Sequence, residues 1–121
     1  MLNLRDRNRG TSARLIPAGT YFAEVLSVDW CDSDKYGPEG AYEVIYRVFS
    51  DDNRQYRHRE VFLNDMENKR TRDFENHVAD SGIEILKDIE GKRVILTFKH
   101  ESKNGTMFSN IVSREFCHDD E

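Results

Sequence analysis

Aromatic and basic side chains crowd a short stretch in the middle of the chain. Tyr56, His58 and Phe62 occupy even positions there, and arginines lie between and before them. Aromatic rings can stack on nucleobases and arginines can neutralise phosphates, so this combination is typical of a surface that holds a single nucleic-acid strand. The residues that we predict for such a surface are Trp30, Tyr36, Arg47, Arg54, Tyr56, Arg57, His58 and Phe62. The alternative is that several of these rings belong to the core.

One acidic stretch partly matches the spacing of a calcium-binding loop, with Asp32, Asp34, Gly37 and Glu43. Tyr36 stands where that loop needs an oxygen ligand, and Pro38 follows the glycine. Helices flank such a loop in the proteins that use it, whereas strands are expected on both sides here. We therefore expect a solvated turn and no metal.

Other catalytic patterns are sparse. A two-metal nuclease would need Asp29, Asp32 and Asp51, with Asp52 beside them, to converge on rigid elements, yet these residues fall mostly in turns. The histidines have no partners at zinc-site spacing, and neither a nucleophile elbow nor a glycine-rich phosphate loop occurs. The sequence predicts a protein that is not an enzyme and has no cofactor.

Size and composition favour one small domain. The chain has 121 residues, of which 37% are hydrophobic and 34% charged, and this is enough to bury a core without disulfides. Cys31 and Cys117 are far apart in the sequence, so we expect reduced thiols. No apolar stretch is long enough to span a membrane, and arginines rather than an apolar signal core follow Met1. We expect a cytoplasmic protein.

Charge is unevenly distributed along the chain. The formal net charge of -5 argues against simple adhesion to nucleic acid. Residues 29–52 are acidic, whereas residues 1–14 and 54–72 each carry an excess of basic side chains. This pattern is compatible with one basic face on an acidic body, or with an ordinary solvated mixture of charges.

The elements that must position these residues follow from the hydrophobic pattern. Residues 1–14 show no period and are predicted to form a flexible basic arm, residues 15–116 the domain, and residues 117–121 a short acidic tail. Alternation with a period of two predicts strands over 21–30, 41–49, 55–63, 92–101 and 106–116. In the second strand, the side chains expected to face inward are Tyr42, Val44, Tyr46 and Val48.

One helix interrupts the strands. Thr71 is a candidate N-cap, Phe74 and Val78 lie one turn apart, and Gly82 can end the helix. Residues 83–89 can add a further helical turn. Asn104-Gly105 predicts a tight hairpin between the last two strands. The order β, β, β, α, β, β predicts a mainly β fold, a five-stranded OB-type barrel with one helix between strands 3 and 4.

Several short motifs occur in a familiar order: Leu15-Ile-Pro-Ala-Gly-Thr-Tyr21, Lys35-Tyr-Gly37, Ser81-Gly-Ile83, Gly91-Lys92 and Asn104-Gly105. From Leu15 to Val112 the chain thereby resembles small OB-fold single-stranded DNA-binding proteins encoded by phages and mobile elements. The resemblance implies coating of single strands during replication or recombination, and the sequence leaves open whether the strand is DNA or RNA. The resemblance also implies recruitment of partner proteins through the acidic end at Asp119-Asp-Glu121, although that end lacks a terminal aromatic residue.

A second hypothesis uses the same barrel differently. OB folds also serve as protein-interaction modules, and the net acidity of the chain favours this alternative. A nucleic-acid binder should expose Tyr56, His58 and Phe62 beside arginines, whereas an interaction module would bury these rings or surround them with acids. The oligomeric state is left open by the sequence.

Overall fold

Alternating inward and outward side chains build five strands. The computed structural model describes residues 15–31, 34–51 and 53–117. Its strands are β1 (Gly19–Cys31), β2 (Ala41–Phe49), β3 (Gln55–Leu63), β4 (Arg93–Lys103) and β5 (Thr106–Phe116). The helix α2 (Lys69–Asp80) lies between β3 and β4, and two short 3-10 turns are η1 (Asp34–Tyr36) and η2 (Leu86–Ile89). The predicted element order is confirmed, and β2, β3 and β5 have the predicted bounds.

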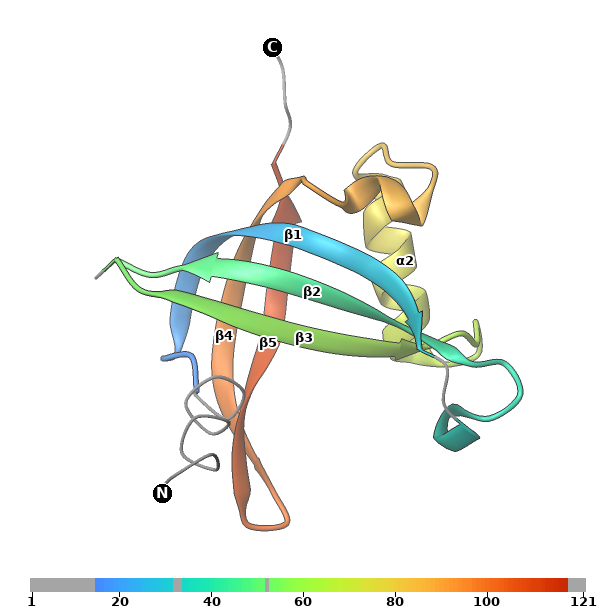
Figure 1. The fold of residues 1–121 in the computed structure, drawn as a ribbon, viewed down its shortest axis with the longest axis horizontal. Helices are drawn as coiled ribbons and strands as arrows, with labels where there is room; N and C mark the ends of the chain where they lie inside the picture. The colour runs from blue at the N-terminus through green and yellow to red at the C-terminus, as the bar shows by residue number, and fades with distance from the viewer. Residues whose placement is uncertain (1–14, 32–33, 52, 118–121) are drawn as a thin grey trace, which may run out of the picture.

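The strands form one antiparallel sheet in the order β3-β2-β1-β4-β5. The sheet curls so that β4 and β5 pass behind β1, β2 and β3, as Figure 1 shows. This is the arrangement of an OB-type barrel, with β3 and β5 as the two ends of the sheet. In the described part of the chain, no backbone ladder joins β3 to β5. We call the gap between these two strands the seam.

The core fills the space inside the curled sheet. Tyr42, Val44, Tyr46 and Val48 are at most 4% exposed, which confirms the predicted inward set of β2. Valines and a leucine from β1 and β4 meet them, and α2 covers one end of the barrel (Figure 1). The rings of Phe62 and Phe74 stack with centroids 4.2 Å apart, so this aromatic pair fastens the helix to β3.

The helix starts earlier than the sequence indicated. Asn68 is the N-cap, and its side chain accepts a hydrogen bond from the Thr71 backbone amide at 3.0 Å. Thr71, the predicted cap, lies inside the helix and is buried, because its hydroxyl donates to the Leu63 carbonyl at the end of β3. Both residue types favour caps, so only this contact with β3 distinguishes them.

The β4–β5 hairpin projects away from the barrel (Figure 1). Asn104 and Gly105 have φ values of 54° and 80°, which are the positive angles of the predicted tight turn. The pairing shifts where Thr97 and Phe98 of β4 face Ser113 and Ile111, so Val112 is an extra residue that bulges β5 near the base of the hairpin.

Some expectations fall outside the described residues. These are the basic arm over 1–14, the end of the acidic tail, and the aspartates at positions 32 and 52. Cys31 and Cys117 are free cysteines. Within the described ranges, no helix has the length and apolar character needed to cross a bilayer.

Candidate nucleic-acid interface

Two of the predicted binding rings belong to the core. Tyr56 is 8% exposed and Phe62 is 1% exposed, and both point into the barrel. The expectation that Tyr56, His58 and Phe62 present their faces to solvent is therefore wrong for Tyr56 and Phe62. The three residues do share one face of β3, but that face is the inner one.

His58 is half-buried on the same inner face. Its ring lies 6.4 Å from the Tyr46 ring and meets the edge of Phe98 at 5.0 Å. Burial lowers the pKa of His58 below its ordinary value, and the positive charges of Arg114 and Arg70 lower it further against the opposing effect of Glu60. His58 is thus a largely neutral packing residue near neutral pH, which does not suit a phosphate contact.

The buried carboxylate of Glu60 fixes which face of β3 is turned toward the core. Glu60 is 5% exposed, and its Oε1 accepts a hydrogen bond of 2.8 Å from the Tyr46 hydroxyl. Its Oε2 accepts 2.5 Å from Arg114 of β5 and 3.5 Å from Arg70 of α2. Burial and the charge of Glu60 raise the pKa of Tyr46. These partners hold Glu60 inside, so its neighbours at even positions must face inside with it.

Trp30 lies away from the other predicted residues. A β-bulge between Val25 and Ser27 reverses the faces of β1 beyond it, so Trp30 turns toward the side where α2 lies. Its ring meets Tyr42 edge-on at 6.1 Å and remains 65% exposed. It borders a groove of about 410 Å³ between the end of β1, α2 and η2.

The outer face of the sheet carries an aromatic row that the sequence analysis missed. Phe22 of β1 lies opposite Phe49 of β2, and Ile95 of β4 lies opposite Phe22 on the other side. Phe22 is 64% exposed and Phe49 38% exposed. Neighbouring strands are about 4.8 Å apart, so the side chains of Phe22 and Phe49 project from adjacent positions on the outer face of the sheet.

A basic row runs beside the aromatic row, about 6.6 Å further along the strands. It consists, from β4 to β3, of Arg93, Glu24, Arg47 and Arg57. Arg47 contacts Glu24 at 3.8 Å, whereas no described residue forms an ion pair with Arg57. Arg47 and Arg57 are direct cross-strand neighbours, and like charges in that position destabilise a sheet unless an anion lies near them.

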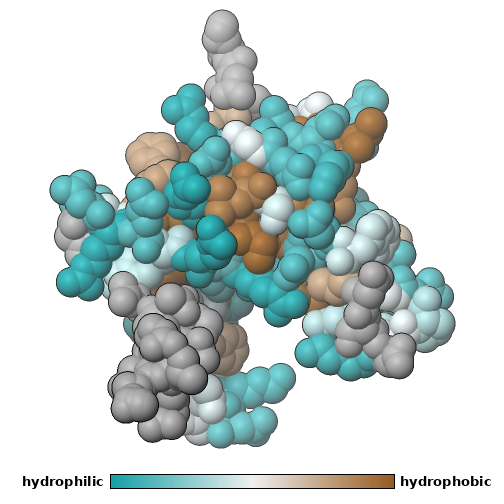
Figure 2. Space-filling model, viewed as in Figure 1, coloured by the Kyte–Doolittle hydropathy of each residue, from teal (hydrophilic) through white to brown (hydrophobic). Residues whose placement is uncertain are grey.

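Two more predicted residues border this face. Tyr36 of η1 reaches Arg59 of β3, and hydrogen bonds to Glu43 and then to Tyr36 raise the pKa of the Arg59 guanidinium. Arg54 is exposed in the turn that joins β2 to β3. Figure 2, viewed as Figure 1, shows hydrophilic residues around apolar ones over the front of the sheet.

The structure thus separates the predicted residues into three groups. Arg47, Arg57, Arg54 and Tyr36 lie on or beside the outer face, Trp30 lies at the groove, and the β3 rings lie inside. The missed residues are Phe22, Phe49 and Arg93. The outward parity of Phe49, which shares the predicted outer set of β2 with Arg47, was the available signal.

Comparison of the chain with family models and with curated proteins found no match. Among the described residues, no group of three or more histidine, cysteine, aspartate or glutamate side chains could hold a metal ion.

Proposed function

We propose that this protein binds single-stranded nucleic acid on the outer face of β1, β2 and β3. The observation that carries the proposal is the pair of parallel rows, one aromatic and one basic, that cross the sheet at right angles to its strands. Bases of one strand would stack on Phe22 and Phe49 while its phosphates lie along Arg47 and Arg57. A duplex hides its base faces, so the rows favour a single strand.

The charge of the surface also supports this proposal despite the net charge of -5. Within the basic row, Arg47 and Arg57 lie beside the single carboxylate of Glu24, so this part of the row is locally positive. A phosphate near Arg47 and Arg57 would remove the repulsion between them. The resemblance of the motifs to phage and mobile-element proteins agrees with a role in replication or recombination in the cytoplasm, with DNA as the strand.

Fluorescence anisotropy of a labelled oligothymidine tests the proposal. We expect the protein to bind it at low salt, to prefer it to duplex DNA, and to release it as salt rises. Phe22→Ala removes one stacking platform and should weaken binding roughly 5- to 150-fold, since each stacked base contributes about 1–3 kcal/mol.

Ile85→Ala is the matched control for Phe22→Ala. Ile85 is 61% exposed, close to the 64% of Phe22, but it lies beside η2 and not on the outer face. It should bind oligothymidine as the unaltered protein does. Absence of binding at low salt, or equal losses in the two variants, would contradict the proposal.

A protein-interaction module is the second candidate, and the burial of Tyr56 and Phe62 favours it. Its docking surface would be the groove between Trp30 and Ile85, two exposed apolar side chains in its lining. Trp30 is the sole tryptophan, so its emission reports that groove alone. A protein that binds no oligothymidine but changes its tryptophan emission with a partner would fit this second candidate.

A further inference from the structure

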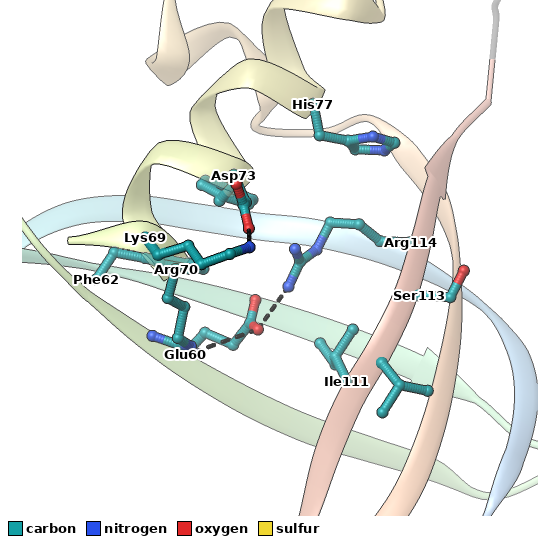
Figure 3. Close-up of a pocket in the computed structure, with 11 residues that line it drawn as sticks. Glu60, Phe62, Lys69, Arg70, Asp73, His77, Ile111, Ser113 and Arg114 are labelled. Carbon is teal, nitrogen blue, oxygen red and sulfur yellow. Dashed lines mark hydrogen bonds and ion pairs between the residues drawn. The ribbon is translucent and has the colours of Figure 1, made fainter. Parts of the chain in front are cut away.

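A second basic cluster lies at the seam, on the inner side of β3 and away from the two rows. It surrounds a pocket of about 570 Å³ between β3, β5 and α2. Glu60, Arg70 and Arg114 meet there, with His77 and Ser113 at its sides, as Figure 3 shows. The outer-face proposal does not use any of these residues.

Charge is unbalanced at this pocket. Arg70 and Arg114 share a single oxygen, Oε2 of Glu60, at 3.5 Å and 2.5 Å. The remaining pair in the wall, Lys69 and Asp73, is neutral as a unit. Two guanidinium groups with one carboxylate leave one excess positive charge. The shorter contact pairs Glu60 with Arg114, whose side chain is 16% exposed, so the excess charge falls on Arg70, whose side chain is 52% exposed and open to a ligand.

The two guanidinium groups are fixed in position. Arg70 lies 4.3 Å above the Phe62 ring and donates to the Val61 carbonyl, while Arg114 lies 4.9 Å above the Phe74 ring. Each guanidinium has five N–H donors in a plane, and the contacts to Glu60 use a part of them. Rigid, parallel donors of this kind match the oxygens of a phosphate.

Two polar atoms in the wall also lack partners. Nε of Arg114 and Nε2 of His77 are buried with no hydrogen bond among the described residues. Ser113 of β5 is exposed at the border of the pocket, next to Arg114 in the sequence. The pocket therefore combines excess positive charge, fixed donors and open space.

We propose that this pocket binds a phosphate group. The phosphate can come from free inorganic phosphate or from a nucleic-acid strand that passes over the edge of β3, and the chemistry of recognition is the same. β3 borders the pocket through Glu60 and the basic row through Arg57, so a strand that crosses the edge of β3 would connect the two surfaces.

Titration of the ¹⁵N-labelled protein with inorganic phosphate, at constant ionic strength set with chloride, tests the site. Saturable shifts are expected at the Nε–Hε signals of Arg70 and Arg114 and at the Ser113 amide. Arg70→Gln should weaken phosphate binding roughly tenfold, the loss expected for a hydrogen bond to a charged group. Arg72→Gln removes a charge from the same helix outside the pocket and should leave the affinity unchanged.

Glu60→Gln gives an independent check, because it removes the carboxylate that competes with phosphate and should tighten binding. Shifts that never saturate, or equal affinities for Arg70→Gln and the unaltered protein, would overturn the proposal. This titration needs no nucleic acid, so its outcome is separate from that of the outer-face proposal.

Oligothymidine binding by Arg70→Gln then identifies the source of the phosphate. Weaker binding than that of Arg72→Gln indicates a phosphate of the strand. Equal binding, together with saturable phosphate shifts, indicates free phosphate as the ligand of the pocket.

Discussion

At the scale of single residues, Glu60 is a buried carboxylate that contacts side chains from three other elements. It joins β2, β3, α2 and β5 through Tyr46, Arg70 and Arg114. A buried carboxylate is costly without partners, and the mostly buried Arg114 is costly without Glu60. The seam between β3 and β5 is therefore held by side chains in the place where backbone hydrogen bonds would close a complete barrel.

Glu60→Ala should destabilise the protein by about 3–5 kcal/mol, because it leaves Arg114 as an uncompensated buried charge. Urea unfolding followed by circular dichroism measures this loss. Glu43→Gln is the control, since Glu43 pairs with Arg59 at the surface and such pairs contribute about 0–1 kcal/mol. Similar losses in both variants would show that the seam does not depend on Glu60.

His58 should make stability depend on pH. Burial lowers its pKa in the folded state below the ordinary 6.5, so the unfolded chain binds a proton more readily than the folded one. The free energy of unfolding should be unaffected by His58 above about pH 6.5 and should fall as the pH drops below that value. His58→Gln should lose this part of the pH dependence, whereas His100→Gln should keep it. Parallel pH profiles for His58→Gln and the unaltered protein would refute the assignment.

At the scale of elements, local patterns predicted the strands well because alternation is a property of neighbouring residues. They did not predict which face of β3 is buried. Tyr56, His58, Glu60 and Phe62 alternate with Arg57, Arg59, Val61 and Leu63, so both sets mix polar and apolar side chains. The choice depends on Arg114, 54 residues beyond Glu60, and no window of sequence contains that contact. The local pattern of β1 also does not show the bulge between Val25 and Ser27, so the face on which Trp30 lies was predicted wrongly.

The start of α2 gives a prediction about an element. Asn68→Ala removes the side chain that accepts from the Thr71 amide, and should cost about 0.5–2 kcal/mol of stability. Asn76→Ala, at an exposed position inside the same helix, should be neutral or slightly stabilising because alanine is the better helix former. Thermal unfolding of the two variants distinguishes loss of the cap hydrogen bond from the general effect of replacing asparagine by alanine in this helix. A loss confined to Asn76→Ala would contradict the assignment of the cap.

At the scale of the whole molecule, an acidic protein with a local basic row should bind nucleic acid with a modest dependence on salt. Each phosphate contact on a single strand adds about 0.7 to the slope of log K against log salt. Arg57→Gln should therefore lower that slope by about 0.7, while Arg72→Gln on α2 should leave the slope for the outer face unaltered. Anisotropy titrations over a series of salt concentrations measure both slopes. An unchanged slope for Arg57→Gln would place the phosphates elsewhere.

The central position of β1 also sets an order of events during synthesis. Its pairs with β2 are local, but its pairs with β4 join Gly19 to Phe98. A ribosome releases β1, β2 and β3 long before β4, so the first three strands can form a meander whose inner face has no cover. Val25, Val44 and Tyr46 are then open to water until the last two strands emerge. The nascent chain is most prone to association with other chains during that interval.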